Sequence, residues 1–215
     1  MNNLNRRHFI RTSLLAGAAV SVASPLAAFA TSARSVNTSQ LKSGVGLTTG
    51  DNRADMVFRA LLPYSRQIRQ AIGNRRVVLK PNNVSIDIPL CATHADTLEG
   101  ILEFLKSIKK LDNVVIAESA ANGPTLDGFS NYGYFRLARK YPVKFIDLDK
   151  EKYEILHVFD EKDFRPHPVR FSSVLLSPDS YVVSVARMKT HDRAVATLSL
   201  KNIVFGAPVK DEGFT

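Results

Sequence analysis

Polar residues that could bind an anion or carry a proton stand at or just past the ends of four short apolar runs. They are Lys80, Glu118, Asp147, Lys189 and His191. Short apolar runs are typical of buried strands, and ligands of open α/β sheets bind outside the carboxyl ends of parallel strands. We therefore expect these side chains to share one edge of a sheet, and His94 to join them in one cleft if it begins the helix after the first strand's long loop. Each residue alone also fits the simpler explanation that strands end at the surface, but the set together indicates a site.

The loop after the first apolar run has a composition that suits a carboxylate or phosphate ligand. Pro81 keeps Lys80 extended, which fixes the direction in which its side chain leaves the strand. Asn82 and Asn83 then offer amide donors. An Asx-type turn at the strand exit explains the same residues without a ligand, and spacing alone favours that simpler explanation.

A second basic segment lies further along the chain. Lys189, His191, Lys201 and Asn202 occur within fourteen residues. Two ammonium groups, an imidazole and an amide together predict an anion pocket that contains a general acid or base. The residues that we assign to ligand binding are Lys80, Asn82, Lys189, Lys201 and Asn202.

Two histidines are candidates for acid/base chemistry. His191 or His94 would transfer the proton, and Glu118 would orient the imidazole. The same three residues could form a two-histidine, one-carboxylate metal set, whereas the spacing of Cys91 and His94 supplies only half a metal site. A lone histidine is more often structural or exposed.

The cofactor is open: a divalent metal is one hypothesis, and a single cysteine excludes a four-cysteine iron–sulfur cluster built from this chain alone.

The elements that must position these residues alternate regularly. Apolar runs expected to form strands are 77–79, 114–117, 143–146 and 181–186. Helical periodicity separates them: a stretch from Met56 that Pro63 interrupts and Gly73 ends, an amphipathic helix that Thr93 would cap, and a helix ending near Tyr141. We expect a short additional strand at 45–48 and an antiparallel excursion within 153–171. The alternation predicts an α/β fold of three layers, with a mainly parallel sheet covered by helices on both faces.

The first thirty residues have the pattern of an export signal. Arg6 and Arg7 precede a mildly apolar run at 14–23, and Ala28-Phe29-Ala30 supplies small residues for cleavage. The arginine pair resembles a twin-arginine signal. We therefore expect recognition by the twin-arginine translocase, a periplasmic or otherwise exported location, and no stable membrane span after cleavage, since the apolar run is too short.

The rest of the chain is expected to form one domain. Residues 1–30 are the predicted signal peptide, 31–43 a flexible leader and 44–215 a single α/β domain. The domain ends without a closing helix or strand, so we expect it to be truncated at its C-terminus.

The formal charge is +9, and removing the three arginines of the signal leaves +6. A basic balance favours anionic partners. Export and the lack of a long run of like charges exclude nucleic acid.

An ordered set of short motifs resembles a known family. The motifs are Lys80-Pro81-Asn82, Ala92-Thr93-His94, 115–119, 147–149, Lys189-Thr190-His191 and Leu200-Lys201-Asn202. Together they resemble the domain-of-unknown-function family numbered 362, over roughly residues 45–206. The resemblance implies the α/β fold and the candidate residues, and no firm activity. Members are typically longer at the C-terminus, and some carry a ferredoxin-like iron–sulfur segment whose cysteines this chain lacks.

The sequence leaves two functions open. One is an enzyme that acts on a small carboxylate or phosphate at the carboxyl edge of the sheet. The other is a non-catalytic ligand- or metal-binding module, or a redox accessory or maturation partner that holds its ligand in the same cleft. The single cysteine makes the redox alternative the weaker one.

Overall fold

The computed structural model describes residues 43–191 and 194–210. The predicted signal peptide and nearly all of the predicted leader lie outside these residues. The described residues from Gly46 onward form one compact unit. None of the helices within the described ranges is both long enough and apolar enough to cross a membrane.

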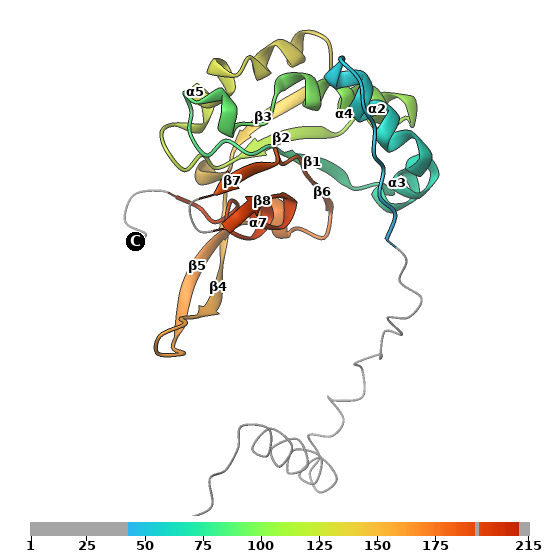
Figure 1. Cartoon of the computed structure of the whole chain (residues 1–215). Coiled ribbons are helices and arrows are strands. Elements are labelled where there is room, and N and C mark those ends of the chain that lie inside the picture. Colours follow the sequence, from blue (N-terminus) through green and yellow to red (C-terminus); the bar gives the residue numbers. More distant parts are fainter. Residues whose placement is uncertain (1–42, 192–193, 211–215) are drawn as a thin grey trace, which may run out of the picture. The chain divides into compact units, whose positions relative to one another are not determined.

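A four-stranded parallel sheet is the centre of this unit (Figure 1). Its strands, in spatial order, are β3 (Val143–Asp147), β2 (Val114–Glu118), β1 (Arg76–Lys80) and β6 (Ser180–Ser184). Every neighbouring pair is parallel. The predicted α/β fold is therefore confirmed, as is the parallel pairing of the first three strands. Parallel neighbours need long crossovers, and the chain supplies helical ones.

Apolar side chains cover both faces of the sheet. Val77 and Leu79 of β1 belong to the larger core, whereas Val78 points to the smaller one, as the period of two in a strand requires. The larger core lies under α2 (Arg53–Leu61), α3 (Ser65–Ile72), α4 (Ala95–Ser107), α5 (Thr125–Asn131) and the 3₁₀ helix η6 (Tyr134–Arg139). On the other face, Val174 of α6 (Ser173–Leu176) and Leu148 of η7 (Leu148–Lys150) pack against the sheet.

The predicted break in the first helical stretch is present. Asn52 caps α2 by accepting a hydrogen bond from the Asp55 N–H at 3.0 Å. Pro63 lies in the 3₁₀ turn η4 (Leu62–Tyr64) between α2 and α3, because its ring cannot continue an α-helix. Gly73, at a positive φ of 55°, ends α3.

Two local predictions were wrong. Residues 45–48 are not a strand, and Thr48 lies against α2, where its hydroxyl donates a hydrogen bond to the Met56 carbonyl at 2.8 Å. Thr93 does not cap α4. The cap is His94, whose Nδ1 accepts from the Asp96 N–H at 3.1 Å, and Thr93 is buried.

The remaining elements lie outside the four-stranded sheet. The predicted antiparallel excursion is confirmed as the two-stranded ribbon of β4 (Tyr153–Phe159) and β5 (Pro166–Ser172). A second antiparallel pair joins β7 (Lys189–His191) to β8 (Ala194–Thr197). The short helices η5 (Pro89–Cys91) and α7 (Ser199–Val204) complete the described elements.

Candidate functional site

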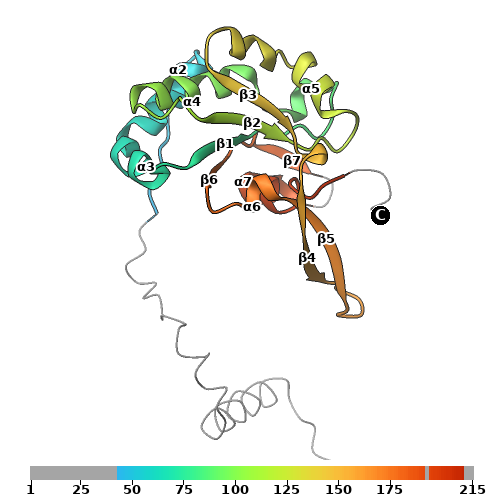
Figure 2. The ribbon, with the colours of Figure 1, turned by 180° about the vertical axis from the view of Figure 1, so that it is seen from behind.

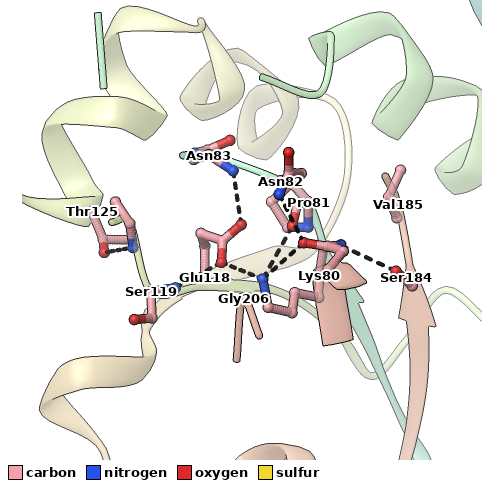
Figure 3. A network of polar contacts seen from close by, with 12 residues as sticks. Lys80, Pro81, Asn82, Asn83, Glu118, Ser119, Thr125, Ser184, Val185 and Gly206 are labelled. Carbon is pink, nitrogen blue, oxygen red and sulfur yellow. Dashed lines mark hydrogen bonds and ion pairs between the residues drawn. The ribbon is translucent and has the colours of Figure 1, made fainter. Parts of the chain in front are cut away.

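An ion pair is buried where β1 and β2 end. The Lys80 ammonium contacts the Glu118 carboxylate, and the two side chains are 0% and 2% exposed (Figure 3). Because β1 and β2 are parallel neighbours, with Leu79 opposite Ile116, their last residues meet at the same sheet edge. The structure therefore brings together these two of the residues that the sequence placed at strand ends.

Both charged groups of this pair have their hydrogen bonds satisfied within the protein. The Lys80 ammonium also donates to the Asn202 Oδ1 at 3.2 Å and to the Pro81 carbonyl at 3.3 Å. The Glu118 carboxylate accepts from the Asn83 N–H at 3.0 Å and from the Ser119 N–H at 2.9 Å. A buried ion pair is tolerated only with such additional partners.

Asn202 ties α7 to the strand ends. Its Oδ1 accepts from the Lys80 ammonium and from the Asn82 amide at 3.1 Å, and its own amide donates to the Lys80 carbonyl at 3.2 Å and to the Ser184 hydroxyl at 3.1 Å. One side chain therefore links β1, the loop after it and β6. Asn202 is 3% exposed, so water cannot reach its side chain, and these four bonds take the place of bonds to water.

A pocket of about 350 Å³ opens beside this network. Its chemistry comes from three lysines, one histidine, one acid and three asparagines among the residues that line it: Lys189, Lys201, Lys210, His191, Glu118, Asn82, Asn83 and Asn202. Lys189 lies at the start of β7 and donates to the Asn82 Oδ1 and the Cys91 carbonyl, both at 2.5 Å. The lysines come from three separate segments, which only the fold brings to one pocket.

The pocket has more positive than negative charge. Of the lining residues that the structure describes, Glu118 is the sole acid, and it pairs with Lys80. Lys189, Lys201 and Lys210 form no ion pair with any residue in the described ranges. An unbalanced cluster of ammonium groups attracts anions.

Two of these lysines have lowered pKa values. Burial lowers the pKa of the Lys210 ammonium to about 8, against an opposing effect of the Glu118 charge. This ammonium lies within hydrogen-bond distance of four oxygens, those of the Ser119 hydroxyl and of the Ser119, Gly206 and Pro208 carbonyls, so its three N–H groups all have acceptors in the protein. Burial also lowers the pKa of Lys189, with a further contribution from the Lys201 charge. Lysines shifted toward neutrality by burial cluster at functional sites.

The two candidate histidines lie in different places. His191, at the end of β7, lines the pocket. His94 is not among the lining residues: it caps α4, lies 3.4 Å from the Asp96 carboxylate and is 46% exposed in its side chain. Asp147 caps η7 through its Oδ1, which accepts from the Asp149 N–H at 3.1 Å, and it does not line the pocket either.

The metal hypothesis gains no support from the placement of these residues. Within residues 43–191 and 194–210, no three histidine, cysteine, aspartate or glutamate side chains are grouped so that they could hold a metal ion. His94 caps α4 and is not among the residues that line the pocket, whereas Glu118 and His191 line it together with the lysines.

Comparison with known proteins agrees with the resemblance. A family model described as Domain of unknown function (DUF362) matches residues 77–213, which is more than half of the chain. The chain belongs to the DUF362 family. No curated protein and no solved structure matches it. All residues that line the pocket fall within the DUF362 match.

Sequence reasoning missed part of the DUF362 pocket. Lys210 follows Pro208 in a segment without helical or strand periodicity, so no local pattern marks it. Asn83 holds the Glu118 carboxylate through its backbone N–H and accepts at its Oδ1 from the buried Tyr134 hydroxyl at 3.0 Å. The tandem asparagines after Lys80 were the signal for this residue, but they indicated a ligand donor rather than a support for Glu118.

Proposed function

We propose that this DUF362 protein binds a small carboxylate or phosphate in the pocket at the carboxyl edge of its sheet. The observation that carries the proposal is the charge balance: three lysines without ion pairs line a pocket whose sole described acid, Glu118, is already paired with Lys80. An anion entering the pocket gains several ammonium donors and meets no uncompensated carboxylate.

The buried ion pair and the pocket lysines have different roles in this proposal. Lys80 and Glu118 are fully engaged with protein atoms, so they hold the strand ends and α7 in position. Lys189, Lys201 and His191 contact the ligand, with Asn82 holding the Lys189 ammonium. The volume of about 350 Å³ is near the lower end of ligand pockets and therefore fits a small molecule.

Inorganic phosphate is the probe that tests binding, measured by calorimetric titration of the full chain. We expect Lys201→Met to weaken phosphate binding about tenfold or more, because a charge-assisted hydrogen bond to the anion is lost. Lys106→Met is the matched control: it also removes one lysine, but an exposed one on α4 outside the pocket. Equal affinity in both variants and the unmodified protein, or no phosphate binding at all, would contradict the proposal.

The pH dependence of binding follows from Lys210. Its pKa of about 8 means that the ammonium loses its proton as the pH rises through that value, and the pocket then loses positive charge. We expect sulfate affinity to fall from neutral to mildly alkaline pH, because sulfate keeps a constant charge there. The decline should be smaller in Lys210→Met. A constant sulfate affinity in the unmodified protein would exclude this assignment.

An enzyme acting on such an anion is the second candidate. The pKa of Lys210, lowered to about 8, favours it, since a lysine that exchanges protons near neutral pH can act as a general acid or base, and burial shifts the pKa of Lys189 in the same direction. His191 lines the same pocket and has the other side chain suited to proton transfer. In this version a protonated lysine binds the anion, and a lysine in its neutral form accepts a proton as the general base.

We further propose that the protein is exported by the twin-arginine route and cleaved after Ala30, as the pattern at Arg6, Arg7 and 28–30 predicts. Replacing both arginines with lysine should leave the precursor in the cytoplasm of its bacterial host. The measurement is fractionation followed by mass analysis of the N-terminus. Normal export of the double-lysine variant would rule out this route.

A further inference from the structure

The β4–β5 ribbon extends away from the four-stranded sheet in both views (Figures 1 and 2). All seven residues of β4 are exposed. The apolar ones include Ile155, which is 56% exposed, and Phe159, which is 74% exposed. A two-stranded ribbon is marginally stable in water by itself, and a group of exposed apolar side chains marks an interaction surface.

The outer edge of β5 is closed to a further strand. The Arg170 carbonyl accepts a hydrogen bond from the Val209 N–H at 2.9 Å, so the even-numbered residues of β5 direct their backbone groups outward. Pro166 and Pro168 share this direction and have no N–H to donate. Prolines at such positions protect an edge from pairing.

The outer edge of β4 has no such protection. The Lys152 carbonyl accepts from Ser173 at 2.8 Å and the Asp160 N–H donates to Arg165 at 3.0 Å, so even-numbered residues of this strand face β5. The odd-numbered residues, Ile155 and His157 among them, therefore direct N–H and C=O groups outward. β4 contains no proline, and in the described part of the chain β5 is its sole strand neighbour.

We propose that two copies of this chain associate by antiparallel pairing of their β4 outer edges, which makes a four-stranded ribbon around a two-fold axis at Leu156. Charge favours a second copy as the occupant. Residues 150–172 contain five basic and five acidic residues and so have no net charge, whereas the whole chain has a charge of +9. Pairing through the projecting ribbon joins the neutral parts of two basic molecules.

The two-fold register at Leu156 is self-complementary. It pairs all seven residues of β4 and makes the hydrogen-bonded positions the odd-numbered residues, whose backbone groups face outward. Tyr153 then lies opposite Phe159 of the partner subunit, an aromatic cross-strand pair at each end. Leu156 lies opposite Leu156 of the partner subunit, and Glu154 lies opposite Val158 of the partner subunit. No like charges face each other in this register.

The test is the concentration dependence of the mass of the full 215-residue chain by sedimentation velocity. We expect a monomer–dimer equilibrium that His157→Pro weakens about tenfold or more, because each protomer loses an outward N–H while the bonds to β5 remain. His157→Ala, which keeps the N–H, should dimerise like the unmodified chain. Leu156→Lys should also weaken the dimer, because it places two like charges opposite each other.

Amide hydrogen exchange gives a second readout. The Ile155 and His157 amides should become more protected as the protein concentration rises, and the His157→Pro variant should show this change at Ile155 only at correspondingly higher concentrations. A chain that stays monomeric at every concentration overturns the proposal. So does a dimer that His157→Pro and Leu156→Lys leave unchanged, because it must use another surface or another occupant of the edge.

Discussion

Glu118→Gln is expected to lower the free energy of unfolding by about 3–5 kcal/mol, because it leaves the Lys80 ammonium buried without its counter-charge. Both side chains are almost completely excluded from water, so solvent cannot replace the lost partner. Since small domains are stable by only about 5–15 kcal/mol, this change removes a large part of the total. Urea unfolding followed by circular dichroism measures the effect.

Two control variants separate charge burial from other causes. Lys80→Met combined with Glu118→Gln removes both charges and keeps one oxygen acceptor, for the Asn83 N–H, but loses the one that accepts from the Ser119 N–H, so it should recover part of the stability that the single variant loses. Asp55→Asn breaks an exposed pair with Arg59 and should change the stability little. A Glu118→Gln protein as stable as the unmodified one would show that the ion pair contributes nothing to the fold.

Asn202→Leu is expected to affect the fold and the pocket together. The side chain is similar in size but loses four hydrogen bonds, two of them to Lys80, so we expect about 2–4 kcal/mol lower stability. Without these bonds α7 loses its side-chain link to the end of β1 and keeps one to β6, where the Ser184 hydroxyl donates to the Ser199 carbonyl at 3.0 Å. Lys201 lies on the same helix, so phosphate affinity should fall at least about tenfold as well.

The measurements that check this prediction are urea unfolding and phosphate titration of the same samples. Leu200→Ala is the matched control, since this side chain lies on the same helix and is 78% exposed. It should leave both quantities nearly unchanged. Lys201→Met should weaken phosphate binding without lowering the stability. An Asn202→Leu protein in which only one of these two quantities falls would contradict the linking role of Asn202.

The strands of the sheet and their direction were predictable from the sequence. Continuous apolar runs such as 114–117 cannot expose a face to water, and amphipathic helices between them leave parallel pairing as the way to bury both faces. The direction of the strands then brings Lys80 and Glu118 to one edge. These are local patterns combined with one general rule of topology, so no tertiary information was needed.

Other features depended on how segments distant in sequence pack together. His94 had the residue type and the helix-start position of a site residue, but its imidazole caps α4 while the neighbouring Thr93 accepts from Asn82 and donates to Val185. By residue type Thr93 is the favoured cap, because threonine is a preferred N-cap residue and histidine is not. The choice between them depends on where the end of β6 comes to lie.

By itself, the sequence determined the α/β class, the parallel strands and the placement of Lys80 and Glu118 at their ends, because each follows from the burial pattern of a few consecutive residues. Only the tertiary structure decided that Asn202, 122 residues from Lys80, completes the buried pair and that Lys210 joins the pocket. Their positions result from packing α7 and the segment after it against the strand ends. Such long-range contacts leave no periodic signal in the chain, because a single side chain makes each of them.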